Sequence, residues 1–182
     1  KINKNKYIIG YVGNIQNRID FQLIRFLAQK NQDKLFILVG KVWPDVDSLY
    51  YEVKKLKNIR FIGQVQHQDL PAIISQFAVA IVPHKINDLT KSMDPMKIYE
   101  YLSCGLPVVS SAVIDPTNFA GLVDVAQSYE EFNQKINQNL NKKQDIIFKQ
   151  QALAFIQKNT WEKRAGEMME IIGHSKKINK IM

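Results

Sequence analysis

Lys97 and Glu100 are the residues with the clearest chemical potential, three positions apart in the stretch DPMKIYEYLSCG. Asp94 and Pro95 are typical of a helix start, as the N-cap and the first helical residue. A lysine in the first turn is unfavourable beside the positive end of a helix unless an anion joins it. Free N–H groups with a lysine form a phosphate site, and a carboxylate one turn further on can accept hydrogen bonds from a ribose diol. This spacing therefore suggests a nucleoside diphosphate lying across the helix start.

The same two residues also fit an ordinary surface ion pair. Such a pair contributes a few tenths of a kcal/mol, and pairs at this spacing are common on helices. The elements around Lys97 and Glu100 therefore have to decide between the two interpretations.

Short apolar runs alternate with helix-period segments along the chain, which predicts an α/β fold. The runs show no clean apolar–polar alternation, so both faces of the sheet should be covered. We expect a Rossmann-like, doubly wound parallel sheet of about six strands with helices on both faces. The polar stretch 84–93 is predicted to be a functional loop. The expected strands are 7–12, 35–39, 59–62, 79–82, 106–110 and 121–125, and the expected helices are 20–30, 46–56, 69–77, 95–104, 129–140, 145–158 and 161–172.

The carboxyl ends of these strands should form the ligand site, as in other doubly wound sheets. Three of them end in glycine, which permits close approach of the backbone to a ligand. Neither GxGxxG nor GxxxxGK[ST] is present, which argues against an ordinary dinucleotide enzyme and a P-loop NTPase. The five ends are Gly13–Asn14, Gly40–Lys41, Gly63–Gln64, Pro83–His84 and the loop that enters Pro95.

Length and composition indicate one domain of 182 residues, with segments 1–6 and 174–182 as frayed basic tails. The net charge of +8 fits phosphorylated ligands or an anionic membrane surface, and no nucleic-acid-binding motif accompanies it. Cys104 is the single cysteine, and the three histidines lack metal-ligand spacing, so we expect no disulfide, metal or cofactor. The absence of a long apolar run or a leader predicts a cytoplasmic protein.

Four stretches resemble the C-terminal, donor-binding half of GT-B glycosyltransferases of the family 1 and family 4 type. They are YIIGYVGNI, KNIRFIGQVQHQDLPAIISQFAVAIVP, DPMKIYEYLSCGLPVVSS and NTWEKRAGEMMEII. The third resembles most closely the branch with a P-x-K-x-x-E-Y pattern, found in bacterial surface-polysaccharide transferases. The fourth is similar to the last helix of that group, so 161–173 is expected to cross toward an N-terminal half.

The resemblance implies roles for individual residues of the donor site. Glu100 would bind the ribose hydroxyls and Lys97 the diphosphate, with Arg18 as a second phosphate cation. The remaining donor-nucleotide residues would be Gly13 at the sugar phosphate, Asn14 where the group usually has arginine, and Gln64 and Val65 at the edge of the nucleobase.

Three further positions are candidate contacts to the donor sugar or phosphate. Ser92 stands where many family 4 members carry a second glutamate, which leaves sugar selection and the stereochemical course open. His84 follows the fourth strand, where a loop-surface role is the alternative, and Met96 precedes Lys97.

The implied function is the nucleotide-sugar-binding half of a hexosyltransferase, with uridine favoured as the base. Helix N–H groups, Lys97 and Arg18 would stabilise the departing diphosphate without a metal. By resemblance the catalytic base lies in an N-terminal half, so we expect these residues alone to be nearly inactive. The acceptor would be a glycan or a lipid-linked sugar, with peripheral membrane association left open. The alternatives are a nucleotide-sugar 2-epimerase-like domain and a non-enzymatic basic binding module.

Overall fold

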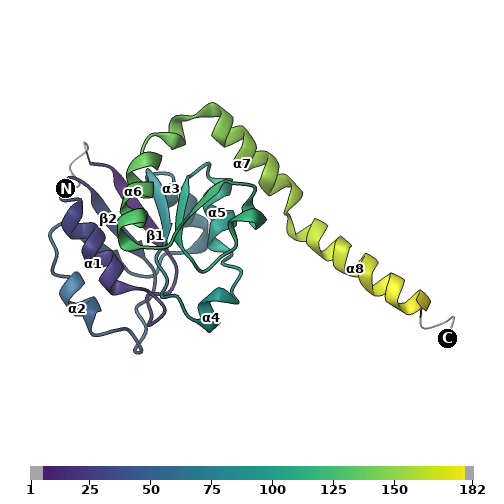
Figure 1. Cartoon of the computed structure of the whole chain (residues 1–182), viewed down its shortest axis with the longest axis horizontal. Helices are drawn as coiled ribbons and strands as arrows, with labels where there is room; N and C mark the ends of the chain where they lie inside the picture. The colour runs from purple at the N-terminus through teal and green to yellow at the C-terminus, as the bar shows by residue number, and fades with distance from the viewer. Residues whose placement is uncertain (1–5, 179–182) are drawn as a thin grey trace.

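The computed structural model describes residues 6–178, which fold around one six-stranded sheet (Figure 1). Every strand pair is parallel, and the order across the sheet is β3-β2-β1-β4-β5-β6. This is the doubly wound Rossmann order, in which the winding reverses between β1 and β4. The strands are β1 (Ile8–Val12), β2 (Leu35–Val39), β3 (Ile59–Ile62), β4 (Val79–Val82), β5 (Val108–Ser111) and β6 (Val123–Ala126).

Two hydrophobic clusters sandwich this sheet, which explains why the strands are apolar on both faces. In β2, Phe36 and Leu38 belong to one cluster and Ile37 and Val39 to the other. The first cluster includes residues of α1 (Phe21–Lys30), α2 (Leu49–Val53) and α6 (Tyr129–Asn139). The second includes residues of α3 (Leu70–Ile74), α5 (Lys97–Ser103) and α7 (Ile146–Lys158).

Several predicted boundaries shift in the structure. The expected loop 84–93 contains a short helix, α4 (Asp88–Lys91), because Asn87 and Thr90 cap it reciprocally. The expected helix 46–56 shortens to α2, and the expected helix 69–77 shortens to α3 after a 3₁₀ turn at His67–Asp69. Further 3₁₀ turns lie at Pro116–Phe119 and Lys142–Gln144.

The predicted start of α5 was wrong. Met96 occupies the N-cap position, and no side chain caps the helix. Asp94 is drawn away by Arg164, whose Nη1 lies 3.3 Å from the Asp94 Oδ2. An attraction between residues 70 positions apart therefore overrides the local capping signal.

The last helix, α8 (Trp161–Ile178), projects from the body as a separate arm (Figure 1). It continues past 173, so residues 174–178 are helical rather than the expected frayed tail. Residues 1–5 and 179–182 of the two expected tails lie outside the described residues. Several of the large apolar side chains of α8 are exposed, among them Trp161, Met168, Met169 and Ile172. None of the helices within 6–178 combines the length and apolar character that crossing a membrane requires.

Candidate functional site: a pocket and a cationic cluster at the switch point

A pocket of about 350 Å³ opens at the carboxyl ends of β1, β2 and β3. Four residues predicted to bind the nucleotide line it together: Gly13, Asn14, Gln64 and Val65. Its other lining residues are Val12, Val39, Gly40, Lys41, Trp43 and Leu70. Because β1 is one of the two strands at the switch point, the pocket lies where doubly wound sheets bind ligands.

The floor of this pocket is made of backbone, because Gly13 and Gly40 touch. Their φ angles are +145° and +147°, a region that favours glycine. A Cβ on Gly40 would lie 2.0 Å from the Gly13 carbonyl oxygen. The strand-ending glycines therefore bring the β1 and β2 loops into direct contact.

Lys97 lies beside this floor rather than on an open helix surface. Its Nζ is 5.3 Å from the centre of the Tyr11 ring, and its Cε would lie 3.1 Å from a Cβ placed on Gly13. Among residues 6–178, no ion pair joins Lys97 to a carboxylate. Burial, reinforced by Arg18, lowers the pKa of Lys97 to about 8, while Glu100 opposes that shift. The position does not match the ordinary surface pair that the spacing also allowed.

Tyr101 fixes α5 against β1 and so sets the position of Lys97. Its hydroxyl is fully buried and accepts a 2.7 Å hydrogen bond from the Val12 backbone N–H, the last residue of β1. Lys97 lies one turn before Tyr101, so the same contact holds its side chain next to Gly13.

Arg18 and His84 come from two segments that are joined through their backbones. The Asp20 N–H donates to the Pro83 carbonyl and the Lys85 N–H donates to the Arg18 carbonyl, each at 2.8 Å. The Tyr11 ring lies next to both His84 and Lys97, with 6.2 Å to the His84 ring centre and 5.3 Å to the Lys97 Nζ. The positive charge of Arg18 acts to lower the pKa values of all three residues. The loop-surface interpretation of His84 was wrong, because the side chain is 1% exposed.

Glu100 lies on the same helix as Lys97 and is half-exposed, with 43% of its side chain accessible. The Nε2 of His67 lies 4.0 Å from the carboxylate Oε1 of Glu100. The carboxylate is therefore accessible to a ligand hydroxyl rather than held in a close ion pair.

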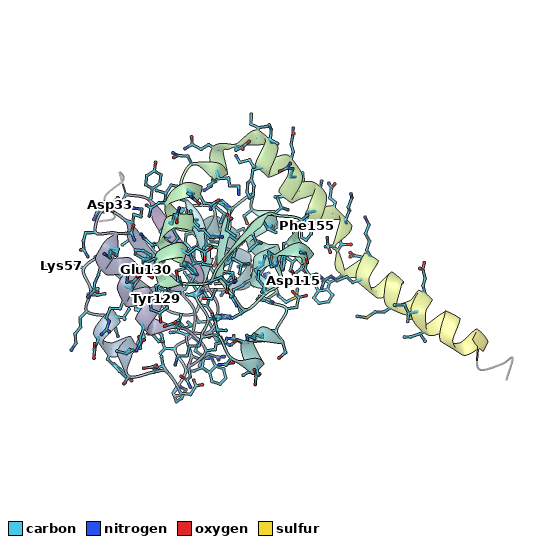
Figure 2. The ribbon with its side chains drawn as sticks, viewed as in Figure 1. Asp33, Lys57, Asp115, Tyr129, Glu130 and Phe155 are labelled. Carbon is cyan, nitrogen blue, oxygen red and sulfur yellow. The ribbon has the colours of Figure 1, made fainter. Side chains whose placement is uncertain are left out.

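Ser92 and Met96 lie apart from this cluster. The Ser92 hydroxyl donates back to the carbonyls of Asp88 and Leu89, and its residue lines a second pocket of about 470 Å³. Asp115 also lines that pocket, on the side of the body from which α8 extends (Figure 2). Met96 is 41% exposed and lines none of the pockets described.

Two residues of the site, Tyr11 and Trp43, were not predicted from the sequence. Tyr11 supplies the ring beneath Lys97, but within YIIGYV it is indistinguishable from an ordinary core strand residue. Lys41 and Trp43 line the pocket, with the Lys41 Nζ 5.1 Å from the Trp43 ring centre. The strand end Gly40–Lys41 was predicted to belong to the ligand site, whereas nothing in the sequence pointed to Trp43. Within 6–178, His, Cys, Asp and Glu side chains do not gather in threes that could hold a metal.

Similarity to solved structures agrees with the topology. Sucrose-phosphate synthase from Thermosynechococcus elongatus superposes with a TM-score of 0.73 at 20% identity, covering 95% of this chain and 46% of that one. The catalytic domain of cholesterol-alpha-glucosyltransferase from Helicobacter pylori superposes with a TM-score of 0.60 at 19% identity, covering 83% of this chain and 95% of that one. A trehalose-6-phosphate structure from E. coli, bound with UDP-2-fluoro glucose, superposes with a TM-score of 0.61 at 15% identity, covering 86% of this chain and 42% of that one. The parallel six-stranded sheet has the GT-B Rossmann-like fold.

Among curated proteins, the chain is similar to TuaH of Bacillus subtilis strain 168, which is named as a teichuronic acid biosynthesis glycosyltransferase. The two are 27% identical over 104 residues, which is 57% of this chain and 26% of TuaH. The chain thus spans about a quarter of the length of this relative. The family model for glycosyl transferases group 1 matches residues 6–142, about three quarters of the chain. The chain therefore belongs to the glycosyl transferases group 1 family.

Proposed function

We propose that this chain is the donor-binding half of a glycosyltransferase and holds the nucleotide part of a nucleotide sugar. The observation that carries the proposal is the position of Lys97. Its amine has no carboxylate partner among residues 6–178 and lies beside the glycine floor of a pocket at the switch point. A cation in that position is suited to a ligand phosphate.

The geometry allows each part of the ligand its own place. The nucleobase occupies the 350 Å³ pocket against Gln64 and Val65, and the Gly13 and Asn14 backbone faces the phosphates. Lys97 and Arg18 bind the diphosphate, and Glu100 accepts hydrogen bonds from the ribose hydroxyls. Uridine is the base we propose, and the UDP-2-fluoro glucose named with one structural neighbour supports it.

The chemistry follows from charge. Cleavage of a sugar–diphosphate bond leaves negative charge on the departing nucleotide, and fixed cations stabilise it. We assign Lys97 and Arg18 to this task, and the base that deprotonates the acceptor to a separate N-terminal half. The name of TuaH supports a cell-surface polysaccharide as acceptor, and the length of TuaH supports a longer whole protein. We also propose that the protein works in the cytoplasm, at the inner face of the cell membrane.

The test is calorimetric titration of the protein with UDP, together with thermal shift against UDP-, GDP- and CMP-sugars. A ligand that binds only the folded state raises the melting temperature. We expect UDP and a UDP-sugar to stabilise the protein. Replacing Glu100 by alanine should weaken UDP binding by about 10²-fold, because hydrogen bonds to a charged group are the strong ones.

The control is Glu130→Ala, which removes an exposed carboxylate that lies near the start of α6 (Figure 2) and lines none of the pockets described. It should bind UDP like the wild type. Equal UDP affinity in wild type and Glu100→Ala, with both proteins folded by circular dichroism, would refute the ribose assignment.

A further inference from the structure

His84 is buried without any hydrogen-bond partner. Both of its ring nitrogens are inaccessible and unpaired within residues 6–178, and so is the Nε of Arg18. Buried polar groups are almost always satisfied in folded proteins, so two such groups side by side require an explanation. A bound ligand that supplies hydrogen-bonding oxygens is one of the standard explanations.

The fold holds these two groups in place. Antiparallel pairing of Ile19 with His84 and the hydrogen bonds on either side of it tie the Arg18 segment to the end of β4. The His84 ring also packs edge-on against Tyr11, with 6.2 Å between ring centres. The histidine is therefore fixed beside the cations and is not a mobile loop side chain.

Charged and titratable groups face His84 from several elements. Tyr11 approaches from β1, Arg18 from the segment after β1, and Lys97 from α5. On another side, a small cavity of about 40 Å³ joins His84 to Asp20 and Tyr129, which are hydrogen-bonded to each other. The Tyr129 end of this cavity lies at the start of α6 (Figure 2). Cations therefore dominate the near environment of the ring.

We infer that His84 is a ligand-contacting residue of the donor site, which binds a diphosphate oxygen and takes up a proton from solvent when the anion binds. The inference rests on the proposed function for the identity of the anion. In the free protein, burial and the nearby Lys97 and Arg18 lower the pKa of His84 to about 3, so the ring is neutral at pH 7. A diphosphate reverses the sign of that local field and favours the protonated imidazole.

This arrangement separates two protonation events by pH. Lys97, with a pKa of about 8, is already charged near pH 6, so a proton taken up there belongs to His84. The ligand and other groups of the protein also exchange protons on binding, and the comparison with His84→Gln isolates the part that depends on His84. The difference in proton uptake between proteins is therefore the measured quantity.

The experiment titrates the protein with UDP and with inorganic pyrophosphate at pH 6.0, in two buffers of different ionisation enthalpy. Wild type should take up measurably more protons per ligand than His84→Gln, which keeps a polar side chain that does not titrate. His84→Phe has a similar shape without ring nitrogens, and it should fold and bind pyrophosphate about tenfold or more weakly. Melting curves check that each variant is folded.

The outcomes separate the two ideas. Equal proton uptake in wild type and His84→Gln, or unchanged pyrophosphate affinity in His84→Phe, would overturn the role of His84. Binding of pyrophosphate with the expected uptake, but of no nucleoside diphosphate, would leave His84 at an anion site and refute the proposed function. Failure of wild type to bind either ligand would refute both.

Discussion

At the scale of single residues, Lys97 carries two opposed demands. The fold places its amine over the Tyr11 ring and close to Arg18, where burial disfavours the charge, yet the proposed diphosphate ligand needs that charge. Its pKa of about 8 means that the amine is mostly charged at pH 7 and mostly neutral once the pH rises above about 8. A bound diphosphate favours the charged form and therefore raises this pKa.

Affinity for UDP should consequently fall as pH rises above 8. The sign follows from linkage: below pH 8 the free protein already carries the proton, whereas above pH 8 binding has to take one up. We expect a fall approaching tenfold per pH unit between about 8.5 and 9.5. Calorimetric titrations across this range measure it.

The matched variant is Lys97→Arg, because a guanidinium stays charged throughout this range. It should bind UDP with little pH dependence between 8 and 9.5. An equally steep fall in Lys97→Arg would show that a different group controls the affinity.

At the scale of elements, α5 depends on one buried hydroxyl. Tyr101→Phe leaves the Val12 N–H without its acceptor, and an unsatisfied buried donor costs about 1–3 kcal/mol. We expect the free energy of unfolding to fall by about that amount in urea denaturation. UDP binding should weaken as well, because the same contact positions Lys97.

Tyr51→Phe provides the comparison, since Tyr51 is 61% exposed on α2. Its free energy of unfolding should stay within about 0.5 kcal/mol of the wild type. If Tyr101→Phe behaved in the same way, the hydroxyl would not be the anchor of α5.

The sequence predicts which elements exist better than it predicts where they meet. Apolar runs ended by glycine correctly mark the strands, and amphipathic spacing marks the helices, because both signals are local. The burial of His84 depends on pairing with a segment more than 60 residues earlier, and Asp94 turns to Arg164 rather than to its own helix. The pocket residues Gly13 and Gln64 were predicted because they end strands of one sheet. Lys41 was predicted in the same way, as part of the end of the second strand, whereas Trp43 lacked any comparable signal.

At the scale of the whole molecule, α8 is attached to the body through its first turn. The Arg164 guanidinium contacts Asp94 at 3.3 Å, donates to the Tyr99 hydroxyl at 2.5 Å and stacks over the Tyr99 ring. These partners flank the start of α5, so Arg164 links the projecting arm to the helix that carries Lys97 and Glu100.

Arg164→Leu should loosen the arm without unfolding the sheet. Hydrogen exchange of α8 amides should quicken, while exchange in β1 and β2 stays slow, because local opening need not involve the core. Lys163→Leu changes an exposed neighbour on the same turn and should leave both rates unchanged. Equal exchange of α8 in wild type and Arg164→Leu would mean that Arg164 is not its tether.

Under the proposed function, the contact between Gly13 and Gly40 also limits how the preferred base could be changed. Gly13 and Gly40 have no side chain to exchange, and a Cβ on Gly40 would collide with the Gly13 carbonyl oxygen. Under that proposal, we expect base selectivity to depend on side chains that line the recess, such as Trp43, Gln64 and Val65. Engineering of the donor would begin at those three positions.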